Sequence, residues 1–395
     1  MMLKSVVILN FVFGNAFNLI PHPLDGKIAY INGLTKKDIV SLSKSEVLEL
    51  KYKFSKHPLL VFQDIKELET KEFVNFVKLF DDYADEEAIK YPGEYPNQML
   101  QPFDQLPDCK HVAPRGNMFL EDYEGLKNLQ IEPFTPFKEN YVWHTDMLGH
   151  DYKMTNLVTG FYTKKSPLIG GETDFISGET IYKSLNNGEK EACKNILVEI
   201  NRQKFVTETS KQNYAGTERT EEFEEGSGTY TVPIAYSKEG PNEEDRILMM
   251  PTFIEKIAGW SVKDTRAWVK MFMNKHVLPH RVSIQWREND LAVFNNRRFI
   301  HSSTPAERYL KNDNGNERFL LQTFIPTKKP LFALKPSAKN VYAGYNNEPK
   351  WLTDPENAVK SSHLAIKYAK DKEEEHSELI SYNDIYCLQR FKERS

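Results

Sequence analysis

Three potential metal ligands, divided between two distant segments, constrain the fold more than any other feature of this sequence. The first segment is Trp143-His144-Thr145-Asp146, in which a histidine and an aspartate stand two positions apart. On an extended chain, side chains with this spacing project to the same side, so both can contact one ion. Taken alone, an exposed strand end with a hydrogen-bonded aspartate explains this short motif equally well.

The third potential ligand, His301, follows Asp146 after 155 positions (301 − 146 = 155). It comes directly after Asp290–Ile300, a segment whose pattern predicts a strand and then a turn. Two histidines and one carboxylate on one side of a metal leave the opposite positions open, which is typical of non-haem Fe(II) oxygenases. A structural zinc site would instead use four protein ligands. We therefore expect His144, Asp146 and His301 to form a catalytic metal centre.

An arginine at the start of a later strand predicts an anion site. Arg318 opens the strand-like segment 318–325, and a buried dicarboxylate needs a bidentate cation, for which a guanidinium is well shaped. The hydroxyl of Thr173, in Gly170-Gly171-Glu172-Thr173, can add a hydrogen bond to the same carboxylate. The alternative for Arg318 is a surface arginine that begins a strand.

In this order, the motifs resemble the taurine dioxygenase (TauD/TfdA-like) family of Fe(II)- and 2-oxoglutarate-dependent oxygenases. The resemblance runs from about Pro21 to Pro326 and rests on HPLLVFQDI at 57–65, WHTD at 143–146, GGETDF at 170–175, ENDLAVFNNRRFIH at 288–301 and ERFLLQTFI at 317–325. It implies a mainly β chain with flanking helices and a double-stranded β-helix (jelly-roll, cupin-like) core. It also implies iron on the His144, Asp146 and His301 triad, O₂ as a cosubstrate, and 2-oxoglutarate held by Thr173 and Arg318.

The sequence departs from the family pattern in two places. The interval from His301 to Arg318 is 17 positions (318 − 301 = 17), longer than usual, and residues 312–316 look like an inserted turn. Arg308 is therefore a rival anchor for 2-oxoglutarate. Gln322 stands where the taurine enzyme has a second arginine for the sulfonate, so taurine is not the expected substrate.

Three residues are candidates for contact with the substrate. They are Asn140, which lies four positions before His144, together with Gln322 and Arg297. The alternative for Arg297 and for its neighbour Arg298 is structural salt bridging.

The resemblance implies oxidation of an unactivated C–H bond in a small carboxylate or amino-acid-derived molecule, with succinate and CO₂ as coproducts. The outcome is hydroxylation, oxidative cyclisation or desaturation. Two alternatives belong to other classes: a zinc hydrolase on the same triad, and a non-catalytic jelly-roll binding module. A zinc hydrolase would not need Arg318. The presence of all three potential metal ligands argues against a non-catalytic binding module.

Composition restricts the kinds of partner. A chain of 395 residues with 40% hydrophobic and 27% charged residues is typical of a globular protein. Its net charge of −4 provides no basic excess to neutralise a nucleic acid backbone. The three cysteines are far apart and form no CxxC pair. We expect a small-molecule substrate and neither a nucleic acid nor a membrane partner, and a homo-oligomer is left open.

One dioxygenase domain is expected over residues 18–335, with loop insertions near 84–138 and 207–228 and a C-terminal extension over 336–395. Residues 1–17 contain an apolar run that is too short to span a bilayer. A targeting leader and an extra buried strand explain this run equally well. The localisation is accordingly open: a soluble chain, cytoplasmic, or organellar if residues 1–17 are a leader.

The hydrophobic pattern predicts several elements of this domain. Helices are expected to begin after Ser43, whose capping box includes Glu46, and after Thr70. The further expected elements are strands at 26–34, 59–62, 157–162, 284–294 and 319–325, an amphipathic helix at 262–276, and a charged helix that includes 370–375.

Overall fold

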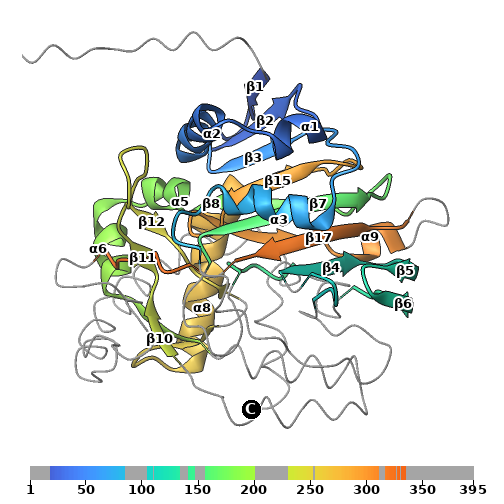
Figure 1. The fold of residues 1–395 in the computed structure, drawn as a ribbon. Helices are drawn as coiled ribbons and strands as arrows, with labels where there is room; N and C mark the ends of the chain where they lie inside the picture. The colour runs from blue at the N-terminus through green and yellow to red at the C-terminus, as the bar shows by residue number, and fades with distance from the viewer. Residues whose placement is uncertain are drawn as a thin grey trace, which may run out of the picture.

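The computed structural model describes residues 18–84, 105–109, 111–133, 141–146, 156–200, 230–251, 254–310, 316–325, 327–329 and 331–334. Their centre is a seven-stranded sheet in the order β1-β2-β3-β15-β7-β17-β4 (Figure 1). Its strands are β1 (Asn18–Pro21), β2 (Ile28–Asn32), β3 (Leu59–Phe62), β4 (Val112–Gly116), β7 (Val158–Lys165), β15 (Leu291–Asn295) and β17 (Phe319–Phe324). All neighbours in this sheet are antiparallel except β2 and β3. The expected strands at 26–34, 59–62, 157–162 and 319–325 are confirmed.

A smaller sheet faces one side of the large one. It consists of β14 (Val282–Ile284), β8 (Thr173–Ser177) and β16 (Phe299–Ser303), in the order β14-β8-β16. A buried apolar cluster from both sheets fills the space between them, and it includes Phe161, Phe175, Phe294, Phe299 and Leu320. Because side chains alternate along a strand, His301 points to the same interior as Phe299.

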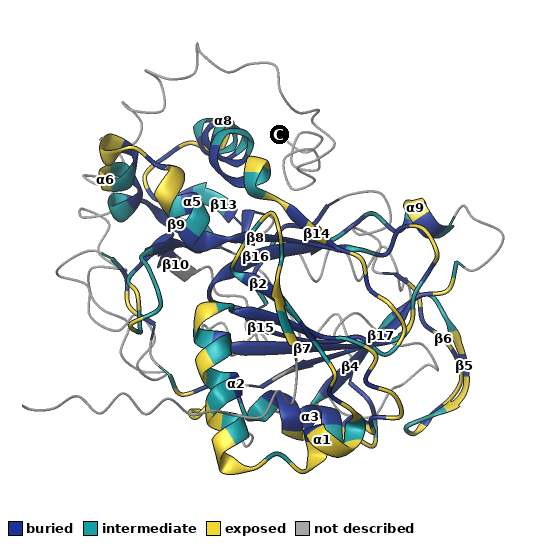
Figure 2. Cartoon of the chain, turned by 90° about the horizontal axis from the view of Figure 1, so that it is seen from above, coloured by how far each residue is buried: buried dark blue, intermediate teal, exposed yellow. Residues whose placement is uncertain are grey.

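Helices cover the other side of the large sheet. They are α1 (Lys36–Val40), α2 (Lys44–Lys56) and α3 (Thr70–Lys78), and Figure 2 shows them as the layer beneath the buried strands. The expected capping box of Ser43 and Glu46 starts α2. For α3 the expected cap was one position late, because Glu69 is the N-cap and the Thr70 hydroxyl instead donates to Glu124 Oε1 at 3.0 Å.

A second apolar cluster lies behind the small sheet, on the side of Ile176 and Ile300. Its elements are α5 (Gly178–Ser184), α6 (Asn187–Asn195), β9 (Leu197–Ile200), β10 (Tyr230–Pro233), β11 (Ala235–Tyr236), β12 (Arg246–Ile247), β13 (Ile254–Ile257) and α8 (Val262–Phe272). A π-helical turn, Met273–Val277, extends α8, so the helix expected at 262–276 is present. The sheet β10-β9-β13 had no counterpart among the expected elements.

Two expectations about chain segments are wrong. Within 84–138, the stretch from Val112 to Gln130 is not a long loop, since it contains β4 and the hairpin β5 (Phe119–Tyr123) and β6 (Leu126–Gln130). Glu124 and Gly125, at positive φ, form the tight turn of the hairpin, while Leu120, Leu126 and Leu129 are buried. The strand expected at 284–294 is interrupted between β14 and β15, because Asp290 Oδ2 accepts from the Arg287 N–H in a turn that has Asn289 at a positive φ of 67°.

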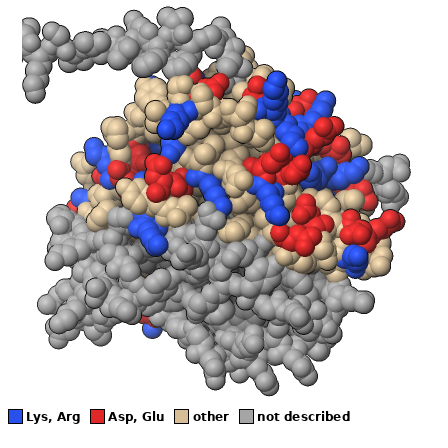
Figure 3. Space-filling view, in the orientation of Figure 1, with Lys and Arg blue, Asp and Glu red and all other residues tan. Residues whose placement is uncertain are grey.

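Several expected features lie outside the described residues: the segment 1–17, the insertion at 207–228, the extension 336–395 and its charged helix. Among the helices that the structure describes, none combines the length and apolar character that a membrane crossing requires. Basic and acidic side chains are interspersed on the described surface in Figure 3.

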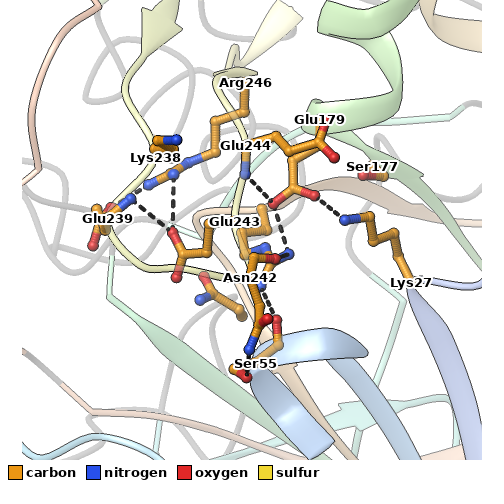
Figure 4. A network of polar contacts seen from close by, with 12 residues as sticks. Lys27, Ser55, Ser177, Glu179, Lys238, Glu239, Asn242, Glu243, Glu244 and Arg246 are labelled. Carbon is orange, nitrogen blue, oxygen red and sulfur yellow. Dashed lines mark hydrogen bonds and ion pairs between the residues drawn. The ribbon is translucent and has the colours of Figure 1, made fainter. Parts of the chain in front are cut away.

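A buried ionic network joins the helical layer to the second apolar cluster (Figure 4). The fully buried Glu179, in α5, contacts Lys27 and accepts from Arg298 Nη2 at 2.6 Å. Arg298 Nη1 also donates to the backbone carbonyl of Ser55, at the end of α2, at 2.8 Å. Arg298 belongs to the turn between β15 and β16, so this network fixes the chain just before the strand that carries His301.

Candidate active site

The two histidines of the triad lie directly opposite each other in an antiparallel β-bridge. The backbone N–H of His144 donates to His301 O at 2.9 Å, and the N–H of His301 donates to His144 O at 2.8 Å. Opposed residues project to the same face, and the two ring centroids are 4.4 Å apart. This bridge explains how residues so distant in the sequence meet.

Asp146 completes the group. Its Oδ1 lies 3.5 Å from His144 Nε2 and 3.6 Å from His301 Nε2. One ligand atom from each of the three residues lies within 4.8 Å of the others, close enough to hold one metal ion. The structure therefore brings together the three residues that the sequence singled out.

The pKa values of Asp146 and His301 are shifted in the directions that metal binding favours. Burial raises the pKa of Asp146, but the adjacent His301 and His144 outweigh burial and hold that pKa well below its usual range. Burial lowers the pKa of His301. His144 Nδ1 lies 2.6 Å from the Val142 carbonyl, to which it can donate, leaving the Nε2 lone pair for a metal. An ionised carboxylate and two neutral imidazoles are what metal binding needs.

Hydrogen bonds hold both the carboxylate and the backbone of Asp146. Thr159 Oγ1, in β7, donates to Oδ2 at 2.9 Å, and Gln322 Nε2, in β17, lies 3.2 Å from Oδ2 and 3.3 Å from Oδ1. Asn296 fixes the backbone, because its Oδ1 accepts from the Asp146 N–H and its Nδ2 donates to the Asp146 carbonyl, both at 2.8 Å. Sequence reasoning missed Thr159 and Asn296, although a polar pair directly after the buried run of β15 was a signal for Asn296.

Aromatic side chains surround His301 instead. The ring stacks on Phe175 with a centroid distance of 5.7 Å and an interplanar angle of 23°. The ring of Phe294 lies 5.1 Å away, at a steep angle. Within the described residues, the buried Nδ1 atom of His301 has no hydrogen-bond partner. Packing therefore orients this imidazole.

Arg318 is a buried cation. Its Nε donates to Gly171 O at 3.1 Å, its backbone N–H donates to Asn117 Oδ1 at 2.7 Å, and burial lowers its pKa. No carboxylate in the described part of the chain lies within ion-pair distance of it. Gly116, at φ 144°, permits the close approach of β4, because a Cβ there would lie 1.7 Å from Arg318 O. Gly116 and Asn117 are a second pair that the sequence reasoning missed.

The rival arginine has a different position. Arg308 lies in the short helix α9 (Glu307–Leu310) and is exposed, with its guanidinium 5.8 Å from the centre of the Tyr141 ring. Thr173 is buried at the start of β8, and in the register of β8 and β16 it pairs with Ser303, two positions beyond His301. Of the two arginines, Arg318 is the buried one.

The remaining candidates differ in their surroundings. Gln322 is buried beside Asp146, on the inward face of β17 that it shares with Leu320. Arg297 is fully buried, and its Nη1 donates to the backbone carbonyl of Lys329 at 2.9 Å, which favours a structural role. Asn140 lies outside the described residues.

Three solved structures have a similar fold, and two of them are described as taurine dioxygenases. A taurine dioxygenase from Burkholderia xenovorans has a TM-score of 0.58 and 14% identity, with 89% of this chain and 99% of that chain covered. A putative alpha-ketoglutarate-dependent taurine dioxygenase from the same organism has a TM-score of 0.57 and 14% identity, with 82% and 96% covered. AAD-2, solved with Mn(II) and N-oxalylglycine, has a TM-score of 0.58 and 14% identity, with 80% and 98% covered. These likenesses concern the fold.

The family assignment comes from the sequence. No curated protein matches the chain significantly. The family model described as "Taurine catabolism dioxygenase TauD, TfdA family" matches residues 22–324, more than three quarters of the chain. The chain therefore belongs to this family and is a 2-oxoglutarate-dependent dioxygenase, an oxidoreductase that uses Fe(II), 2-oxoglutarate and O₂.

Proposed function

We propose that His144, Asp146 and His301 hold the iron. The observation that carries this assignment is the position of Asp146 Oδ1, which lies 3.5 and 3.6 Å from the Nε2 atoms of the two imidazoles. Two nitrogen donors and one carboxylate oxygen suit Fe(II) and leave coordination positions for other molecules.

Arg318 and Thr173 are the proposed contacts of the far carboxylate of 2-oxoglutarate. A buried guanidinium without a carboxylate partner in the described chain is costly, and a bound dicarboxylate supplies the missing charge. Thr173 Oγ1 accepts from Trp286 Nε1 at 2.9 Å, so the hydroxyl's own proton is left for another acceptor. The exposed Arg308 is the poorer anchor, because water screens its charge.

The proposed reaction is oxidation of an unactivated C–H bond in a small carboxylate or amino-acid-derived substrate. Bound iron, with 2-oxoglutarate and O₂, supplies the oxidant, and succinate and CO₂ are the coproducts. The protein's part is to orient the groups and to exclude water, which the buried aromatic cluster around His301 favours. Hydroxylation, cyclisation and desaturation are all compatible with this site.

The proposal also covers the fold of the core and the extent of the catalytic domain. The two facing sheets, with the site between them, are the arrangement expected of a double-stranded β-helix core. We assign catalysis to a single domain over residues 18–335, and Asn140, just before the triad segment, remains a proposed substrate contact.

The test is succinate release from 2-oxoglutarate in the presence of Fe(II), with and without candidate substrates. Mass spectrometry of the substrate then distinguishes the outcomes, because hydroxylation adds one oxygen atom whereas cyclisation or desaturation removes two hydrogen atoms. Substrate turnover with Zn(II) alone, without 2-oxoglutarate, would instead favour a hydrolase.

A further inference from the structure

Gln322 uses both ends of its amide within the protein. Its Nε2 donates toward Asp146, at 3.2 Å from Oδ2 and 3.3 Å from Oδ1. Its Oε1 accepts from Arg115 Nε, in β4, at 3.1 Å. Since the donor and the acceptor both have partners and the side chain is buried, the amide is oriented toward Asp146 rather than left available for a substrate.

The sheet register explains this chain of contacts. Arg115 pairs with Leu320 and Ala113 pairs with Gln322 in the antiparallel ladder of β4 and β17. Arg115 and Gln322 are therefore diagonal neighbours on the same, inward face of the sheet. A guanidinium can only donate, so it selects the orientation of the amide in which Oε1 faces Arg115 and Nε2 faces the carboxylate.

The two oxygens of Asp146 consequently have different surroundings. Oδ2 receives the Thr159 hydroxyl at 2.9 Å, while Gln322 Nε2 lies at nearly the same distance from both oxygens, 3.2 and 3.3 Å. Oδ1 is the oxygen that lies between the Nε2 atoms of the two histidines. Thr159 at Oδ2 and Gln322 across both oxygens therefore fix the rotation of the carboxylate and keep Oδ1 facing the histidines.

We propose that Arg115 and Gln322 form a relay that orients the Asp146 carboxylate for the metal, with Gln322 as a positioning residue and Arg115 fixing its amide. The inference rests on the proposed function, since it requires a metal at the triad. It assigns two tasks to this part of the chain: Arg318, directly before β17, serves the cosubstrate, and Gln322, in β17, serves the metal ligand.

The relay predicts a specific pattern of metal affinity. Mn(II) binding to the full chain is measured without O₂ from the electron paramagnetic resonance signal of the free ion. Gln322→Leu, which keeps the side chain's bulk but not its donor, should weaken Mn(II) binding by about 10–100-fold, as is usual for the loss of a contact to a ligand. Arg115→Met should weaken binding less, by severalfold, because Gln322 can still reach Asp146 in one of its two orientations.

The double variant separates a relay from two independent effects. Arg115→Met should add no further loss in the Gln322→Leu background, whereas independent effects would multiply. Gln130→Leu makes the same exchange at an exposed position in the β5–β6 hairpin, where it removes a hydrogen bond to Ile131 O, and serves as a control with unchanged affinity.

The outcomes distinguish this inference from the proposed function. If the unaltered protein binds Mn(II), His144→Ala abolishes binding, and both Gln322→Leu and Arg115→Met bind as well as the unaltered protein, the relay is wrong and the metal site stands. Additive losses in the double variant would also overturn the relay. If the unaltered protein binds no Mn(II), or His144→Ala leaves binding unchanged, the metal assignment fails and the relay fails with it. Should Gln322→Leu not fold, the Arg115→Met result decides.

Discussion

The surroundings of Asp146 and of His301 show two different ways of holding a proposed metal ligand. Asp146 is fixed by hydrogen bonds from Thr159, Gln322 and Asn296, which come from three different parts of the chain. His301 is fixed by the rings of Phe175 and Phe294, and its Nδ1 has no polar partner among the described residues. Hydrogen bonds orient Asp146 through specific donors, whereas ring packing orients His301 and also contributes to stability.

Substitution of any one of the three proposed metal ligands should have the largest effect on activity, whether hydrogen bonds or packing hold that residue. His144→Ala, Asp146→Ala and His301→Ala each remove one of three protein donors, so each should abolish Fe(II)-dependent succinate formation. Circular dichroism verifies that the variants are folded. A folded Asp146→Ala variant that retains most of its activity would show that this aspartate is only a structural cap.

Phe175→Ala tests the packed side of the comparison. Removing this buried ring should lower the free energy of unfolding by about 3–5 kcal/mol, because it leaves a cavity beside His301. The measurement is chemical denaturation of the metal-free protein, with Phe175→Leu as a milder replacement. An unchanged unfolding midpoint in Phe175→Ala would mean that the aromatic cluster does not support the site.

Arg318→Ala extends the comparison to the proposed contact between Arg318 and the cosubstrate 2-oxoglutarate. Loss of a buried charge-assisted pair costs about 2–5 kcal/mol, so the concentration of 2-oxoglutarate for half-maximal rate should rise at least tenfold (about 1.4 kcal/mol per factor of ten). Arg308→Ala, which alters an exposed arginine, should change it little. Equal effects of the two substitutions would indicate that Arg308 shares the anchor.

Thr159→Val tests the hydrogen-bonded side with the smallest structural change. The variant keeps the shape of the side chain but loses the donor to Asp146 Oδ2, so Mn(II) affinity should fall by about tenfold while stability falls by about 1–3 kcal/mol. Thr323→Val is a matched control, because Thr323 is equally buried and donates to His111 O at 2.7 Å, away from the triad. If the two variants lose the same metal affinity, the contact to Asp146 has no special role.

The sequence alone identified the residues whose chemistry is distinctive. His144, Asp146 and His301 could be proposed because few residue types bind iron, and Arg318 because a guanidinium at the start of a strand suits a dicarboxylate. Thr159 and Arg115 could not be found this way, because they are ordinary residue types whose roles depend on strand register. Only the polar pair after the buried run of β15 pointed to Asn296. The same reason explains the misjudged segment 112–130, where turn residues between short strands were read as one loop.

The most direct test of the central claim is an anaerobic titration of the Fe(II)-loaded protein with 2-oxoglutarate, followed by visible absorption. It requires no knowledge of the substrate, because a 2-oxo acid that chelates Fe(II) through its keto and carboxylate oxygens produces a metal-to-ligand charge-transfer band. We predict that the band appears and saturates in the unaltered protein, needs more 2-oxoglutarate in Arg318→Ala, and is absent in Asp146→Ala. Absence of the band in the folded, iron-loaded protein, or its persistence in Asp146→Ala, would contradict the assignment of this site.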